Sequence, residues 1–223
     1  MHSPTPRVVL PALALLCATA PVPPAMPADP TSSVPSRPTA PTHGQATAWF
    51  AKAAGRGLPE SGRLLVVSVK DQRLYEIAPA GLLRTYVIST AAAGVDNRAN
   101  SNGTPSGWHR VVARHGADAV PGQAFVSRRP TKEILPPGQW RTAGGGDYVL
   151  TRILHLGGLE PGVNQGGNVD SFDRCIYLHG TNQEHLLGTP ASHGCIRLSN
   201  RDVMELFDDV DGRETYCWIT DLP

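Results

Sequence analysis

The sequence predicts a mainly β fold with one clear helix near its C-terminal end. Its 223 residues include 23 Gly and 21 Pro but only 6% aromatic residues, which suits a loop-rich β protein better than a helical bundle. Several short runs are rich in β-branched residues, which is typical of strands. Residues 199–210 combine a capping pattern with apolar residues at helix spacing. This length predicts one folded domain.

The first part of the chain has the features of an export signal followed by a spacer. Arg7 precedes a short apolar run and then small residues, a pattern too short to span a bilayer and typical of a secretory signal peptide. Cleavage after Ala20 or after Ala28 fits, and an uncleaved N-terminal anchor is the alternative. The predicted organisation is therefore a signal peptide at 1–28, a Pro-rich spacer at 29–44 and a folded domain at 45–223.

The folded part is expected to open with a short helix and a β-hairpin. Residues 45–54 predict a helix with Trp49 and Phe50 on its apolar side, and Gly55 ends it. Two strands then flank a turn at Asp71–Gln72. The predicted strands are 63–69, 73–77, 82–90, 108–113, 148–156, 175–179, 192–198 and 215–220.

Residues 115–147 are rich in Gly and Pro and carry several Arg residues, so we expect a long loop. A loop of this length inside a compact domain is usually functional or mobile. Two interpretations stay open, a lid over a functional site and a meandering surface insertion.

The C-terminal helix has a defined start and a defined buried face. Ser199 is the expected N-cap, with Asp202 at the N3 position. The apolar face consists of Val203, Leu206, Phe207 and Val210.

Residues 192–198 are predicted to be extended, with a cysteine at their centre. Alternate side chains of an extended chain share a face, so His193, Cys195 and Arg197 should point one way and Ile196 the other.

The predicted strand at 175–179 has the same period. Ile176 and Leu178 take the core side, while Tyr177 and His179 take the opposite side. If the two strands lie side by side, a thiol, an imidazole and a guanidinium share one surface. These groups are a nucleophile, a base and a partner for an anion.

At these residues the chain resembles a known family. His179-Gly180-Thr181 is followed by Ser192 to Arg197, reading Ser-His-Gly-Cys-Ile-Arg, and then by Asn200 and Asp202. This order resembles the L,D-transpeptidase catalytic domain family (YkuD-type), and the resemblance covers roughly residue 63 to the C-terminus. It implies a curved mixed β-sheet, sandwich- or barrel-like, with one helix after the catalytic cysteine.

The resemblance also implies roles for the motif residues. Cys195 is the nucleophile, His179 is the general base, and His193 lines the same site. The Gly180 carbonyl is a plausible orienter of the imidazole, and the N–H groups of Gly194 and Cys195 are oxyanion-hole candidates. An adjacent base is expected to favour the thiolate, so removing it should raise the thiol pKa toward about 8.5.

Three residues are candidates for substrate binding. Arg197 either holds a substrate carboxylate through its planar fork or forms a structural ion pair with Asp202 or Asp208, and both readings stay open. Tyr177 either walls the site or packs in the interior. Ser192 is the third candidate.

The implied function is that of an exported bacterial enzyme of the periplasm or cell envelope, acting in peptidoglycan biosynthesis without a cofactor. Cys195 would attack the carbonyl of the diamino-acid residue at stem position three and release the terminal D-Ala. The thioester would pass to an amine of a second stem peptide or to water. The acceptor stays open: a cross-link, protein attachment, D-amino-acid exchange or hydrolysis.

The remaining partner expectations follow from charge and the N-terminal segment. A net charge of +1 with no Lys/Arg run predicts no nucleic-acid partner. Membrane contact is expected only through an uncleaved N-terminal segment.

Two rival functions come from other classes. The first is a zinc site built from His179, His185, His193 and Cys195, although these donors lack a short paired spacing. The second is a non-catalytic cell-wall-binding module, against which the His179 and Cys195 pair argues.

Cysteine count adds one constraint. After removal of the signal peptide, Cys175, Cys195 and Cys217 remain, an odd number that predicts at least one free thiol. Whether Cys175 and Cys217 pair stays open.

Overall fold

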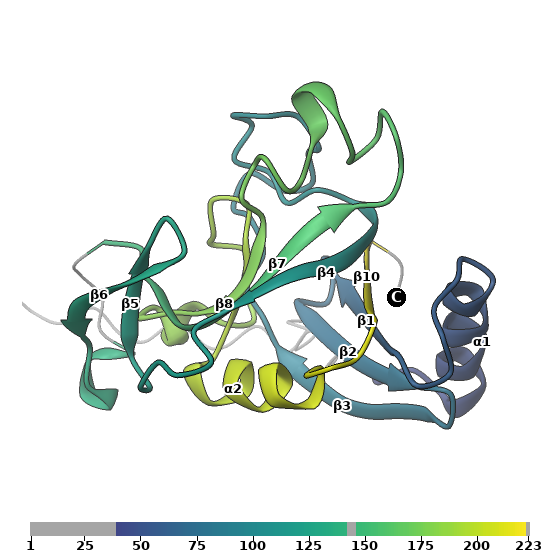
Figure 1. Ribbon diagram of the computed structural model, residues 1–223, viewed down its shortest axis with the longest axis horizontal. Helices are drawn as coiled ribbons and strands as arrows, with labels where there is room; N and C mark the ends of the chain where they lie inside the picture. Colours follow the sequence, from purple (N-terminus) through teal and green to yellow (C-terminus); the bar gives the residue numbers. More distant parts are fainter. Residues whose placement is uncertain (1–38, 142–145, 222–223) are drawn as a thin grey trace, which may run out of the picture. The chain divides into compact units, whose positions relative to one another are not determined.

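One mixed β-sheet of ten strands dominates the computed structural model, which describes residues 39–141 and 146–221 (Figure 1). The main strand order is β3-β2-β1-β10-β4-β7-β5-β6, and β8 and β9 continue from β7. Pairing is antiparallel except for β1 with β10 and β8 with β9, so the predicted mainly β, mixed-sheet class is confirmed. The elements are α1 His43–Ala54, β1 Arg63–Ser68, β2 Arg73–Ala78, β3 Gly81–Val87, β4 Gly107–His115, β5 Gln123–Val126, β6 Arg129–Ile134, η1 Pro137–Gln139, β7 Val149–Gly158, η2 Gly167–Val169, β8 Tyr177–Gly180, η3 Glu184–Leu186, β9 Ile196–Leu198, α2 Asn200–Asp209 and β10 Thr215–Thr220.

The predicted signal peptide at 1–28 and the spacer as far as residue 38 lie outside the described residues. In the part of the chain that the structure does describe, no helix has the length and apolar character needed to cross a membrane.

Strand β1 is buried on both faces, which explains its continuous apolar sequence. Leu65 and Val67 contribute to one core, which also contains side chains of β8, β9 and α2. Leu64 and Val66 contribute to a second core on the opposite face, which α1 covers. The sheet is therefore enclosed between the two helices.

Helix α1 begins at His43, two residues earlier than predicted. The start is fixed by a capping box, in which Thr42 and Gln45 each bond the backbone of the other. Phe50 is buried and Trp49 is partly buried against the second core, which confirms the predicted apolar side.

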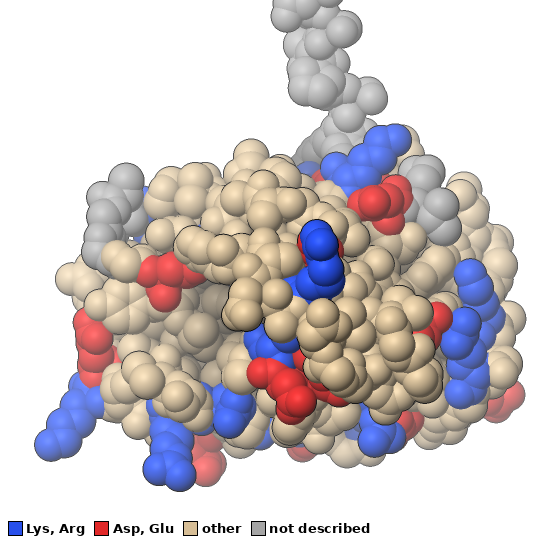
Figure 2. Space-filling model, turned by 90° about the horizontal axis from the view of Figure 1, so that it is seen from above, with Lys and Arg blue, Asp and Glu red and all other residues tan. Residues whose placement is uncertain are grey.

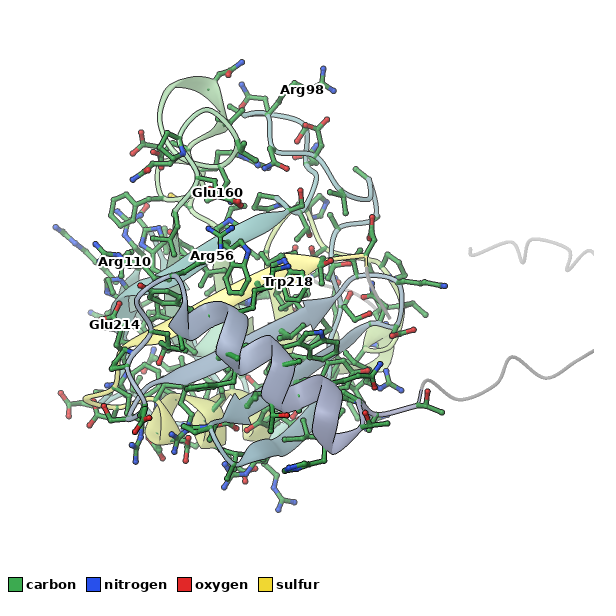
Figure 3. The ribbon with its side chains drawn as sticks, turned by 90° about the vertical axis from the view of Figure 1, so that its right-hand side faces the viewer. Arg56, Arg98, Arg110, Glu160, Glu214 and Trp218 are labelled. Atoms are coloured by element: carbon green, nitrogen blue, oxygen red, sulfur yellow. The ribbon has the colours of Figure 1, made fainter. Side chains whose placement is uncertain are left out.

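Aromatic rings and cations join α1 to the sheet. Trp108 and Trp218 stack with ring centroids 5.2 Å apart. Lys52 lies 4.3 Å from the Trp218 ring, and the Arg56 guanidinium lies 4.9 Å from the Trp108 ring. Figure 3 shows Arg56 close to Glu160, with which it forms an ion pair.

Helix α2 matches the prediction closely. The Ser199 hydroxyl accepts the Asp202 N–H at 3.0 Å and caps the first turn. The predicted apolar face packs into the first core, directly behind β9: Val203, Leu206, Phe207 and Val210.

The expectation of a long loop at 115–147 is wrong for its middle part. Residues 123–134 form the hairpin β5–β6, which extends the sheet beyond β7. Its two-residue turn is Ser127 and Arg128, which have φ values of 48° and 68°. Pro130 is tolerated because β6 is an edge strand, and this residue masked the strand signal.

A buried carboxyl group joins the first hairpin to α2. Glu76 on β2 is fully buried and accepts a hydrogen bond from the Tyr86 hydroxyl at 2.7 Å. Arg63 lies 2.7 Å from Asp209 and 3.7 Å from Glu76. Burial, followed by the neighbouring Asp209 carboxylate, raises the pKa of Glu76 to about 7.

This raised pKa makes stability pH-dependent. Between about pH 4.5 and pH 7 the folded protein keeps a proton on Glu76 that the unfolded chain has lost, so the free energy of unfolding falls as pH rises. We predict that Glu76→Gln, which imitates the protonated form, removes this slope. The variant should exceed wild type by about 1–3 kcal/mol at pH 8 and by little at pH 5 in urea unfolding.

Glu214 is an exposed glutamate, so Glu214→Gln is the matched control. A Glu76→Gln variant equally destabilised at both pH values would contradict the prediction and indicate a stably ionised Glu76.

Candidate active site

The parallel pairing of β8 with β9 brings the two motifs together. Leu178 lies opposite Ile196, and His179 lies opposite Arg197. Leu178 and Ile196 are fully buried in the first core, and Cys195 lies on the other face of the strands, packed beside Tyr177. The predicted division of faces is therefore confirmed for the strands themselves.

The prediction of an extended chain through residues 192–195 is wrong. Only β9 is extended, and Gly194, with a φ of 131°, turns the chain before it. His193 and Arg197 differ in burial, since the His193 side chain is 71% exposed and that of Arg197 is 1% exposed, yet both reach Oδ2 of Asp147.

Ser192 holds this turn in shape. Its hydroxyl donates to the Cys195 carbonyl at 2.6 Å and accepts the Gly194 N–H at 3.2 Å. Thr104 donates to the Gly194 carbonyl at 2.9 Å. Ser192 is buried and its hydrogen-bonding capacity is used within the protein, so it is placed to shape the loop.

The backbone just before and at the start of β8 holds the Cys195 thiol. The thiol donates to the Cys175 carbonyl at 3.3 Å and accepts the Tyr177 N–H at 3.4 Å. Cys175 has a φ of 57°, an uncommon conformation for a residue other than glycine, and for this reason β8 begins two residues later than predicted.

His179 has the tautomer that a base requires. Its Nδ1 lies 2.7 Å from the Gly180 carbonyl oxygen, which only accepts, so Nδ1 carries the proton and Nε2 is left bare. The imidazole is almost fully buried. No hydrogen bond joins these two described side chains, His179 and Cys195, at rest.

Burial opposes an ion pair between these two groups. It lowers the pKa of His179 to about 4 and raises the pKa of Cys195 to about 12, although the cysteine side chain is partly exposed. This differs from the expectation that the imidazole favours a thiolate. At neutral pH the site contains a neutral thiol and a neutral imidazole.

Arg197 is an internal structural cation. It forms an ion pair with Asp147 and donates to Gln183 Oε1 at 2.9 Å. Arg197 therefore forms a structural ion pair, but the predicted partners Asp202 and Asp208 are wrong. The actual partner, Asp147, precedes β7 and lies far upstream in the sequence, so local spacing did not indicate it.

Asp147 is a site residue that the sequence analysis missed. It accepts a hydrogen bond from His193 Nδ1 at 2.9 Å as well as pairing with Arg197. Burial alone would raise its pKa, but these two partners lower it below the ordinary value. No motif or local spacing marks this residue.

Gly180 is required by close packing. A Cβ atom there would lie 2.4 Å from Asn200 Oδ1 and 2.9 Å from the Leu150 carbonyl oxygen. Asn200, fully buried, donates to the Thr181 carbonyl at 2.7 Å and ties β8 to the start of α2. The Gly180 carbonyl is therefore held where it accepts from His179.

A cavity of about 350 Å³ lies beside this turn. It is situated where the loop before β4 meets the loop before β8, which are joined by a 2.6 Å hydrogen bond from Ala99 N–H to the Asn168 carbonyl (Figure 1). Its lining includes Asn102, Asp173 and His193. Figure 2 shows Lys and Arg interspersed with Asp and Glu on the face seen from above, so neither charge dominates it.

In the described part of the chain, the cysteines and the candidate zinc ligands do not form the pairs or clusters that were considered. Cys175, Cys195 and Cys217 are all free, and Cys217 is buried in the first core. His185 is exposed on η3. Across residues 39–141 and 146–221, no three His, Cys, Asp or Glu side chains are grouped so that they could hold a metal ion.

Comparison with known proteins identifies a family. The family model described as the L,D-transpeptidase catalytic domain, YkuD, matches residues 62–216. The putative L,D-transpeptidase YqjB of Bacillus subtilis (strain 168) is 29% identical over 97 residues, 41% of this chain and 55% of that protein. The probable L,D-transpeptidase ErfK/SrfK of Escherichia coli (strain K12) is 29% identical over 155 residues, which are 69% of this chain and 43% of that protein. The chain spans about half the length of these curated relatives.

Solved structures give weaker likenesses. An L,D-transpeptidase from Mycobacterium smegmatis has a TM-score of 0.41 and 17% identity, over 71% of this chain and 58% of that chain. An L,D-transpeptidase (residues 123–326) from Xylanimonas cellulosilytica DSM 15894 has a TM-score of 0.40 and 19% identity, over 77% of this chain and 68% of that chain. These scores support no conclusion by themselves. The family model, however, covers well over half of the sequence, and the chain belongs to the L,D-transpeptidase catalytic domain family, a family of cysteine enzymes.

Proposed function

We propose that this chain is an exported L,D-transpeptidase that forms a thioester with a peptidoglycan stem peptide. The family acts on such stem peptides, which implies a location outside the cytoplasm. The observation that carries the proposal is the arrangement on one face of β8 and β9. There the partly exposed Cys195 directly precedes β9, and His179 lies on the paired strand β8 with its Nε2 free to accept a proton.

Acylation begins with a neutral pair. As Cys195 Sγ attacks the carbonyl carbon of the residue at stem position three, its proton leaves the hydrogen bond to the Cys175 carbonyl and passes from Sγ to His179 Nε2. Proton transfer accompanies attack, because burial makes a free thiolate unfavourable. The Gly180 carbonyl, which accepts from Nδ1, stabilises the imidazolium that forms.

Collapse of the tetrahedral intermediate breaks the bond to the terminal D-Ala. His179 returns its proton to the departing amine, and the thioester on Cys195 remains. The Cys195 N–H, which has no acceptor among the described residues, is the best-placed oxyanion donor. The Gly194 N–H would first have to leave Ser192.

Deacylation repeats these steps with an incoming nucleophile. An amine of a second stem peptide gives transfer, and water gives the alternative L,D-carboxypeptidase reaction. The cavity lined by His193 and Asp173 supports binding of an amine acceptor, because it is adjacent to the turn that carries Cys195 and contains an exposed carboxylate. His193 lines this cavity and is held by Asp147, so we assign it to substrate contact.

The first test is the nucleophile. Cys195→Ala should abolish D-Ala release from a stem tetrapeptide and leave the unfolding temperature nearly unchanged, because the thiol makes only two weak hydrogen bonds. Mass spectrometry of wild type, with and without an amine acceptor, should detect an acyl adduct on Cys195 and assign transfer or hydrolysis. Near-normal turnover in the variant would eliminate the cysteine mechanism.

The second test separates the two histidines. His179→Gln should lower kcat by about 10²–10⁴-fold, whereas His193→Gln should lower it by less than tenfold. Iodoacetamide labelling of Cys195 in wild type should keep rising through pH 9, because burial raises its pKa. The pH dependence of this labelling should be nearly the same in His179→Gln, because a neutral imidazole adds no charge beside the thiol.

Labelling must be resolved by peptide mass, because Cys175 is also partly exposed. A larger loss of kcat in His193→Gln would reverse the two roles. A labelling plateau near pH 7 would indicate a preformed thiolate instead.

A further inference from the structure

Arg128 lies at the turn of the β5–β6 hairpin and reaches the residues that hold the nucleophile. Its Nη1 donates to the Tyr177 hydroxyl at 3.0 Å and to Cys175 Sγ at 3.3 Å. The backbone groups of these same two residues bond the Cys195 thiol. Tyr177, Cys175 and Cys195 also pack in one cluster. The Arg128 guanidinium therefore contacts the side chains of both residues whose backbone holds the catalytic thiol.

The hydrogen-bond partners of Arg128 are neutral groups. A phenol oxygen and a thiol are its hydrogen-bond acceptors, and no carboxylate in the described part of the chain forms an ion pair with it. Guanidinium offers five N–H donors in a planar fork, and both of these bonds use Nη1. Other arginines, by contrast, pair with carboxylates: Arg63, Arg84, Arg98, Arg114 and Arg197.

The surroundings add no compensating negative charge. His115 and His155 lie close enough for Arg128 to lower the pKa of each, in addition to the larger effect of burial. Both rings are therefore neutral at pH 7. The hairpin turn presents a positive charge beside the site without an anion to balance it.

Arg197 cannot take this role. Its side chain is 1% exposed and already engages Asp147 and Gln183, so binding a substrate carboxylate would require displacing Asp147 from a buried guanidinium. Arg128 is partly exposed, and nothing anionic occupies it. A third guanidinium, that of Arg174, also lies near Cys195, but it donates to the carbonyls of Asp96 and Gly103 at 3.1 and 2.7 Å. Arg128 has no backbone carbonyl or carboxylate among its hydrogen-bond partners in the described part of the chain, so we take it as the guanidinium available to a ligand.

We propose that Arg128 binds a carboxylate of the donor stem peptide and positions its scissile bond at Cys195. This inference rests on the proposed function. The donor has two suitable carboxylates close to the reacting carbonyl: the terminal carboxylate of D-Ala and the side-chain carboxylate of a diamino-diacid at position three. Guanidinium recognises both through the same paired hydrogen bonds.

The experiment crosses enzyme variants with substrates. Arg128→Gln, Arg128→Lys and the control Arg129→Gln are each measured with three tetrapeptides: the diamino-diacid form with a free C-terminus, its C-terminal amide, and a form with Lys at position three. Arg129 is the neighbouring exposed arginine of the same hairpin. Unfolding temperatures verify that all variants are folded.

We expect Arg128→Gln to lower kcat/KM on the first peptide by about tenfold to hundredfold, mainly through KM. Arg128→Lys should recover part of this loss, because it keeps the charge and loses the fork. Arg129→Gln should match wild type. The peptide that lacks the carboxylate bound by Arg128 should react slowly with wild type. Its kcat/KM should be the same with Arg128→Gln as with wild type. The peptide that behaves in this way identifies which carboxylate Arg128 binds.

Two results would overturn the inference: no loss in Arg128→Gln, or the same loss on all three peptides, which would mean that Arg128 acts through Tyr177 and Cys175. Failure of the proposed function is distinguishable, since wild type would then release no D-Ala from any peptide. Calorimetric binding of the three peptides to Cys195→Ala, with and without Arg128→Gln, supplies a readout independent of turnover.

Discussion

The parallel register between β8 and β9 is the constraint on which the site depends. Because side chains alternate along a strand, pairing His179 with Arg197 sends Leu178 and Ile196 into the core and leaves Cys195 on the opposite face. A slip of one residue would exchange the two sets of side chains. The buried face of α2 and the core side of β1 pack against this apolar set and oppose such a slip.

The ion pair between the buried Arg197 and the partly exposed Asp147 is the second constraint. Loss of Asp147 would leave a buried guanidinium without its carboxylate, so Asp147 must stay beside β9. Asp147 also fixes His193 at the cavity rim. A residue remote in sequence thereby positions both the strand of the nucleophile and the edge of the binding surface. The same burial keeps thiol and imidazole neutral, which favours proton transfer during attack over a stored thiolate.

Local sequence patterns predicted the elements whose shape is decided locally. Strand alternation located β8 and β9, and a capping residue with apolar spacing located α2. The turn at Gly194 was missed because an alternating pattern does not reveal a residue with positive φ. The hairpin β5–β6 was missed because Pro130 and flanking glycines obscured a short edge strand. Asp147 and Arg128 reach the site only through tertiary contacts, so spacing along the chain carried no information about them.

The central claim is that the resting site is a neutral thiol beside a neutral imidazole protonated on Nδ1. Nitrogen-15 NMR of histidine-labelled protein, combined with the carbon-13 shift of Cys195 Cβ, measures both protonation states directly at pH 7. The account predicts a His179 signal with Nδ1 protonated and Nε2 bare, and a Cys195 shift typical of a thiol. A doubly protonated His179 together with a thiolate shift at Cys195 would contradict it.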